Sequence, residues 1–148
     1  MKMNDVLYRR LRHLFDSQLI AVLSTSKDDQ PYVCLVSFVV DEEMDFLIFS
    51  TRRNRLKYHH IEANPRVSLI IDDRRNIPVD LHEATSVTIF GIATDTKDEE
   101  KGICTDLLLS RHQNLTNFVN HPDTAVIKVD IEKMYVVSDF ESVKVVEA

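Results

Sequence analysis

The sequence predicts a mainly β fold, an antiparallel β-barrel with flanking helices in a single domain, 1–148. Short runs rich in Val, Ile, Phe and Tyr recur from residue 19 to residue 146, separated by polar turns. Few helical segments lie between these runs, so most of them are joined as hairpins, which favours an antiparallel barrel over a parallel α/β sheet. A chain of 148 residues without an internal repeat or a linker is expected to form one domain.

Four segments are expected to be helical. Residues 3–15 place apolar side chains at near-helical spacing, which predicts an amphipathic first helix. Residues 54–63 form a second helix, which an Asn-Pro pair ends because the residue before a proline leaves the α region. Residues 97–111 carry acidic side chains near their start, as the helix dipole favours. Residues 114–120 are expected to form a short helical turn.

The expected strands are short, and one of them contains a glycine. Gly91 interrupts the run 86–94, which indicates a bulge or a close backbone approach. The polar turn 26–31 joins the first two strands as a hairpin, and the polar loop 72–85 precedes the strand with the glycine. The expected strands are 19–23, 32–40, 46–50, 66–71, 86–94, 125–129, 133–137 and 143–146.

Composition argues against several classes of protein. The net charge is −6 with neutral histidines, whereas domains that bind nucleic acid or anionic membranes are usually basic. No apolar run is long enough for a membrane span, and no signal peptide is recognised. Cys34 and Cys104 lack a CxxC spacing, which favours reduced thiols in a cytoplasmic protein. Gly91 and Gly102 are the only glycines, so glycine-rich nucleotide loops are excluded.

A basic segment, 49–57, stands out in this acidic chain. No carboxylate lies between Asp45 and Glu62, and four cations lie within residues 52–57. The segment joins an expected strand to an expected helix, so it combines hydroxyls, cations and open backbone N–H groups. This combination predicts a site for one phosphate group. A solvated helix face and a simple helix cap at Ser50-Thr51 are the alternatives.

Seven motifs follow one another along the chain: IAVLST (20–25), QPYVCLV (30–36), FST (49–51), RLK (55–57), NPRVSL (64–69), GIA (91–93) and IEKMYVV (131–137). In this order and with these spacings they resemble the FMN-binding split-barrel family, also called the pyridoxamine 5'-phosphate oxidase-like superfamily. The resemblance extends over residues 14–140. It implies a six-stranded antiparallel split barrel that forms a homodimer, with FMN in a groove at the dimer interface.

The same resemblance implies roles for individual residues. Arg55 and Lys57 would bind the FMN phosphate, and the hydroxyl or backbone groups of residues 50 and 51 would donate hydrogen bonds to the phosphate and the ribityl chain. Residues 32–36 would lie along the flavin ring and offer backbone groups to its polar edge. The implied cofactor-binding residues are Tyr32, Val33, Cys34, Leu35, Val36, Ser50, Thr51, Arg55 and Lys57. Arg52, Arg53, Arg74 and Arg75 have no assigned role, and no catalytic acid or base is recognised.

The resemblance implies a flavin-dependent oxidoreductase with a small-molecule redox substrate, because the flavin itself carries out electron or hydride transfer. True pyridoxamine 5'-phosphate oxidases have a C-terminal signature with tryptophan and arginine, and this chain has no tryptophan, so that activity is not expected. A non-enzymatic flavin or haem carrier or sensor, and a reductase that uses the deazaflavin F420, are the alternatives. No metal site is expected, since the adjacent His59 and His60 would point about 100° apart on a helix.

Overall fold

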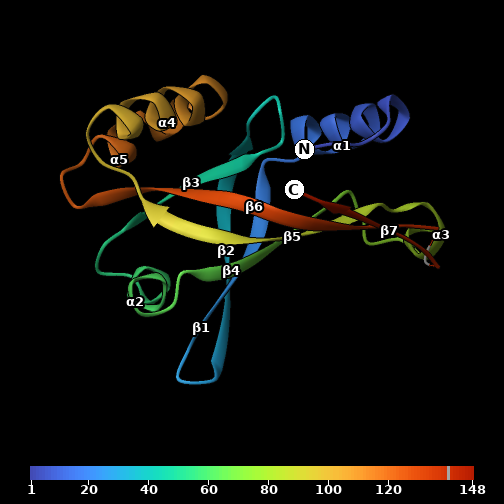
Figure 1. The fold of residues 1–148 in the computed structure, drawn as a ribbon, viewed down its shortest axis with the longest axis horizontal. Helices are drawn as coiled ribbons and strands as arrows, with labels where there is room; N and C mark the ends of the chain where they lie inside the picture. The colour runs from blue at the N-terminus through green and yellow to red at the C-terminus, as the bar shows by residue number, and fades with distance from the viewer. Residues whose placement is uncertain (140) are drawn as a thin grey trace.

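Six strands close an antiparallel barrel in the computed structural model, which describes residues 1–139 and 141–148 (Figure 1). Their order is β3-β2-β1-β4-β5-β6, the pairing of β3 with β6 closes the ring, and β7 adds to β6. The prediction of a mainly β fold with an antiparallel barrel is therefore confirmed. The strands are β1 Ile20–Lys27, β2 Gln30–Val40, β3 Phe46–Arg52, β4 Arg66–Asp72, β5 Ser86–Asp95, β6 Thr124–Ser138 and β7 Ser142–Glu147.

The barrel is split between β2 and β3. Strand β2 pairs with β1 along residues 30–37, but it pairs with β3 only at residues 38–40. Strand β3 pairs with β6 along its whole length. On the edge away from β1, residues 32–37 therefore have no strand partner among the residues that the structure describes. Backbone polar groups along this edge are open to a ligand.

The hairpin of β1 and β2 is longer than the sequence suggests. Strand β1 continues past residue 23 to Lys27, and only Asp28 and Asp29 separate it from β2. Both residues have positive φ, 51° and 62°. A two-residue hairpin turn of this kind needs positive φ at both central positions, which Asp tolerates better than most residues. The turn therefore forms without a glycine.

One long strand replaces two expected ones. The sequence suggests separate strands at 125–129 and 133–137, but β6 runs through both because β5 pairs with it on either side of a bulge at Phe90/Gly91. A Cβ atom on Gly91 would lie 2.3 Å from the carbonyl oxygen of Asp130. The expected bulge with close backbone approach is confirmed, and it explains why this strand position needs a glycine.

The helices flank the barrel. Helix α1, Asp5–Ser17, begins at Asn4, whose side chain accepts a hydrogen bond from the Leu7 N–H at 2.8 Å, and its buried side chains join the barrel core. Helix α4, Asp98–Arg111, packs outside the barrel and shares a second apolar cluster with side chains of β2, β3 and β6. The remaining helices are α2 Leu56–Ala63, α3 Asp80–Glu83, the 3-10 turn η1 Gln113–Leu115 and α5 Thr116–Val119.

The expected loop 72–85 contains a short helix, α3, that no pattern in the sequence predicts. The Asp80 carboxylate accepts the backbone N–H groups of Arg75 and Ile77, so local hydrogen bonds shape this short helix. Figure 1 shows α3 at the opposite end of the molecule from α2. Arg74 and Arg75 pair with Asp72 and Glu83 there, which gives these two arginines a local structural role.

Candidate cofactor-binding site

A groove opens at the split of the barrel. It has a volume of ≈ 460 Å³, and binding sites for small ligands commonly measure about 300–1,000 Å³. The groove, which we call the split groove, lies between the open edge of β2, the end of β3, the start of α2 and the segment of η1 and α5. Seven of the residues that the family resemblance implied line it: Tyr32, Leu35, Val36, Ser50, Thr51, Arg55 and Lys57.

Apolar side chains form much of the wall of the split groove. Leu35 and Val36 come from β2, and Leu115 and Phe118 face them from η1 and α5. Because the groove follows an open strand edge, residues from both faces of β2 contribute to it. An apolar wall beside unpaired backbone N–H and C=O groups suits a flat ring with a polar edge.

The basic end of the split groove has two uncommitted cations. Arg55 and Lys57 make no ion pair within residues 1–139 and 141–148. Arg55 is the N-cap residue of α2, and no described side chain caps the first turn of this helix. The first N–H groups of a helix lack intrahelical acceptors, and the first residues of α2, Leu56 and Lys57, line the groove together with Arg55. This end of the groove is suited to a phosphate.

The neighbouring arginines are engaged with the protein. Arg53 donates to the carbonyl oxygen of Pro122 at 3.1 Å, pairs with Asp95 at 3.4 Å, and lies over the ring of Tyr58. Burial lowers the pKa of Arg53, but its contacts with Tyr58 and Asp95 outweigh burial and hold the pKa above its ordinary value. Arg53 therefore stays charged and fixes the turn between β3 and α2.

Arg52 is engaged on the other side of the turn. Its guanidinium donates to the Thr124 hydroxyl at 2.9 Å and lies 4.6 Å from the ring centroid of Phe118. This contact holds α5 against the end of β3, and so it helps to shape the apolar wall of the split groove. The Thr51 hydroxyl is buried and donates to the Arg52 carbonyl, whereas Ser50 is only half-buried.

Helix α2 is held to the barrel by two polar contacts. The Tyr58 hydroxyl donates to the Asp95 carboxylate at 2.7 Å, and burial together with this hydrogen bond raises the pKa of Tyr58. The His60 ring nitrogen Nδ1 and the Thr25 hydroxyl are 3.0 Å apart. The same imidazole meets the ring of Tyr32 edge-on, with 5.8 Å between centroids. The basic end and the apolar wall are thus tied into one rigid unit.

Two implied residues do not line the split groove. Val33 is 63% exposed and points to the outer face of the barrel, and Cys34 packs against the barrel core. Burial raises the pKa of the Cys34 thiol, and the charge of Lys57 partly offsets this effect. The structure gives Cys34 a packing role beside the groove rather than a position within it.

The structure adds six groove residues to which the resemblance assigned no contact with the cofactor. Ser37, Arg52 and Asn54 each lie next to a motif, and Leu56 lies within the motif 55–57, so their sequence positions alone could have indicated these four. Leu115 and Phe118 lie some 60 residues further on, in a segment with no pattern that marks it as part of a site. Only the packing of α5 against β3 brings them to the groove.

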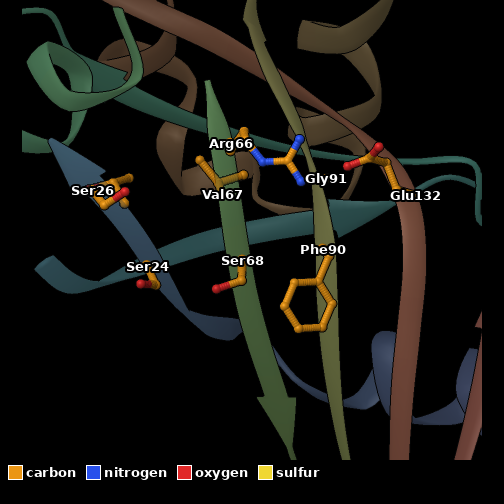
Figure 2. A pocket seen from close by; sticks show the side chains of 9 residues that line it. Ser24, Ser26, Arg66, Val67, Ser68, Phe90, Gly91 and Glu132 are labelled. Atoms are coloured by element: carbon orange, nitrogen blue, oxygen red, sulfur yellow. The ribbon is translucent and has the colours of Figure 1, made fainter. Parts of the chain in front are cut away.

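A second hollow lies on the outer face of the barrel, where Ser24, Ser68 and Phe90 stand side by side on three adjacent strands (Figure 2). Arg66 and Glu132 border its other side in the same view. Its volume is ≈ 160 Å³, about a third of that of the split groove. It is too small for a cofactor with a tricyclic ring, so the split groove is the better candidate.

The described residues contain no group of three or more His, Cys, Asp and Glu side chains that could hold a metal ion. His112 is buried and its Nε2 lies 2.7 Å from the Phe38 carbonyl, which is a structural contact between α4 and β2. None of the helices in the described part of the chain has the length and apolar character needed to cross a bilayer.

Comparison with known proteins identifies relatives of this chain. Residues 8–138 match the pyridoxamine 5'-phosphate oxidase family. The chain is also 31% identical over 158 residues to a pyridoxamine 5'-phosphate oxidase homologue of Schizosaccharomyces pombe, an alignment that covers 81% of this chain and 83% of the yeast protein. Both matches confirm the superfamily that the sequence motifs indicated.

Solved structures share the fold at low sequence identity. A haem-binding protein of Mycobacterium smegmatis superposes with a TM-score of 0.84 at 14% identity, over 99% of this chain but only 60% of that protein. A FAD-binding protein of Mesorhizobium loti superposes with a TM-score of 0.70 at 20% identity, over 86% of this chain and 90% of that protein. These likenesses confirm the split-barrel fold.

Proposed function

The chain belongs to the pyridoxamine 5'-phosphate oxidase family, and we propose that it binds FMN in the split groove as a flavin-dependent oxidoreductase of a small-molecule substrate. One observation carries the proposal: the uncommitted cations Arg55 and Lys57 stand at an uncapped helix start, at one end of a groove with an apolar wall. A phosphate needs charge-assisted partners, and a flavin ring needs an apolar wall with a few fixed polar groups.

Each part of the groove has its own task in this proposal. Arg55, Lys57 and the first N–H groups of α2 bind the phosphate, and Ser50 donates its hydroxyl to the phosphate or the ribityl chain. The open edge of β2 offers backbone groups to the polar edge of the ring. When bound, the flavin supplies electron or hydride transfer, so the protein needs no dedicated acid or base in the groove. Its side chains orient the ring and limit the access of water.

A homodimer is part of the proposal, because a largely apolar row of side chains on the outer face of the sheet is at least partly exposed. Paired positions on six adjacent strands form one row across this face, consisting of Leu35, Val22, Ile70, Thr88, Tyr135 and Val145. Leu35 is 68% exposed and Val145 is 51% exposed. Contiguous exposed apolar surface usually marks an interface, and a second copy of the chain is the commonest partner.

Sedimentation velocity tests the dimer. We expect a dimer for the wild-type protein and a monomer for Ile70→Lys, since the new charge would lie in the centre of the apolar row. Val6→Lys is the matched control, because Val6 is 79% exposed on α1 and lies outside the row. A monomeric wild-type protein at micromolar concentration contradicts the dimer.

Haem binding is a second candidate, favoured by the fold similarity to a haem-binding protein. The described lining of the split groove includes no histidine, cysteine or methionine that could serve as an axial ligand. Histidines occur instead in a neighbouring cavity, which contains His59 and His121. The residues that line the split groove therefore favour a flavin over haem. A deazaflavin such as F420 would make the same phosphate contact.

Equilibrium titration tests the cofactor. We expect FMN fluorescence to be quenched with one FMN per chain, and NAD(P)H to be consumed by the loaded protein. Unaltered fluorescence at micromolar protein, together with a Soret band after addition of haem, would reverse the assignment. FMN binding without NAD(P)H consumption would favour a carrier or sensor.

A cytoplasmic location is also part of the proposal, and the two free thiols Cys34 and Cys104 support a reducing compartment.

A further inference from the structure

A further cavity, distinct from the hollow on the outer face, adjoins the basic end of the split groove. It has a volume of ≈ 690 Å³, and we call it the basic cavity. Three residues line both hollows, namely Arg52, Asn54 and Arg55, so the two meet at the turn between β3 and α2. The basic cavity has four further lining residues: Arg53, His59, His121 and Asp123. A ligand bound through its phosphate beside Arg55 has this cavity directly beyond the phosphate.

The charge of the basic cavity is unusual for this chain. Three guanidinium groups and two imidazoles line it against a single carboxylate, that of Asp123, although the whole chain has a net charge of −6. No ion pair within the described residues engages Asp123. Arg53 and His59 have carboxylate partners outside the lining, Asp95 and Glu62, whereas Arg52 has none among the described residues. Arg55 and Lys57 suffice for the phosphate in the split groove, since one phosphate needs one or two charge-assisted partners.

The cations of the basic cavity are held in place but retain donors. Arg52 contacts Thr124 and Phe118, and Arg53 contacts Pro122, Asp95 and Tyr58. A guanidinium has five N–H donors, and these contacts use only some of them. Fixed side chains with spare donors lose little entropy on binding an anion, so the cavity is preorganised.

His121 is oriented in the same way. Its Nδ1 accepts the backbone N–H of Asp123 at 3.1 Å, and its carbonyl oxygen accepts the N–H of Thr124 at 3.0 Å. An Nδ1 that accepts a hydrogen bond places the proton of the neutral ring on Nε2. The imidazole of His121 is thus fixed by the turn before β6 and can donate from Nε2.

Building on the proposed function, we propose that the basic cavity is a subsite for a second phosphate, beyond the phosphate of the flavin. Two ligands have this chemistry. The second phosphate can be attached to the first, as in flavin adenine dinucleotide, or it can belong to a separate phosphorylated substrate that enters beside the bound flavin. Both place an anion among Arg52, Arg53 and His121, and only the covalent linkage differs.

Dissociation constants for FMN and FAD test the subsite without any measurement of activity. We expect FAD to bind about tenfold more tightly than FMN, equivalent to about 1.4 kcal/mol. His121→Glu should remove this advantage and Asp123→Asn should increase it, because the first adds and the second removes a negative charge in the basic cavity. Neither substitution should change the affinity for FMN more than about twofold, since both residues lie outside the split groove.

A second titration separates the two sources of phosphate. Calorimetry of the FMN-loaded protein with ADP measures whether a free phosphorylated molecule occupies the basic cavity. If ADP binds, His121→Glu weakens its binding, and the protein binds FAD no more tightly than FMN, the cavity belongs to a separate phosphorylated substrate. Equal affinities for FMN and FAD together with no binding of ADP overturn the subsite while leaving the FMN site intact. Failure to bind FMN at all instead overturns the proposed function.

Discussion

The two halves of the basic segment differ in what their cations contact. Arg52 and Arg53 are used within the fold, against Thr124, Phe118, Asp95 and Tyr58. Arg55 and Lys57 have no ion pair in the described chain, and they line the split groove. Four cations that look equivalent in the sequence therefore divide into a pair that shares its donors with the fold and a pair that makes no ion pair with the described chain.

The largest expected effect tests the available pair. Arg55→Ala combined with Lys57→Ala should weaken FMN binding by at least about a hundredfold, because each charge-assisted hydrogen bond contributes about 1.5–3 kcal/mol. The melting temperature without ligand should not change, since neither side chain forms an ion pair in the described chain. Fluorescence titration and calorimetric melting measure the two quantities.

The control for this double variant removes the same charge elsewhere. Arg9→Ala with Lys144→Ala replaces two exposed cations outside the split groove. It should leave FMN affinity unchanged, because neither side chain lines the split groove and exposed charges are screened by salt. If both double variants lose FMN affinity equally, the effect comes from net charge, and the proposed phosphate contacts of Arg55 and Lys57 are wrong.

The next effect tests the structural pair. Arg53→Ala removes the contacts with Pro122, Asp95 and the Tyr58 ring, so it should lower the free energy of unfolding by about 1–2 kcal/mol. For a chain of this size that corresponds to a fall in melting temperature of about 4 °C. Arg55→Ala should not lower the melting temperature. If the two single variants melt at the same temperature, the structural difference between the halves is wrong.

The smallest effect concerns Cys34, next to the available pair. Burial raises the pKa of this thiol and the charge of Lys57 lowers it, so Lys57→Ala should raise the pKa further. The thiolate is the reactive form, so alkylation of Cys34 should shift to higher pH in this variant.

Mass spectrometry can follow the two thiols separately. Cys104 is 2% exposed within the α4 cluster and serves as the internal reference, because Lys57 is not among the charges that act on it. Bound FMN should also slow the alkylation of Cys34, since its phosphate neutralises Lys57. If the pH profile of Cys34 alkylation is the same in the wild type and in Lys57→Ala, the ammonium group of Lys57 is too far away to affect the thiol.

Local patterns predicted most of the elements, and the errors have tertiary causes. The strand at 46–50 and the helix at 54–63 were expected, and β3 and α2 occupy nearly these positions. Residues 125–137 looked like two strands because the apolar alternation weakens at 130–133, where pairing with β3, β5 and β7 keeps the chain extended. Strand pairing is non-local, so no sequence window contains the partner that decides it.

In the candidate site too, the sequence pattern shows some features and the packing decides others. Alternation along β2 shows that Val33 and Leu35 share one face, but it does not show which residues lie beside the split. Leu35 lines the groove and Val33 does not, although both lie on the edge of β2 that β3 leaves unpaired. Phe118 was missed altogether, since its place in the wall depends on its contact with Arg52.

The sequence alone determined the family, the antiparallel strands and the location of a phosphate-sized cluster of cations, because each depends on residue types at short spacing. The tertiary structure decided which of those cations are available. Asp95 and Thr124 lie 42 and 72 residues after the arginines that they bind, and folding brings them to the turn. A cation keeps all of its donors for a ligand only where the fold supplies it no such partner, and that is a property of the packed chain.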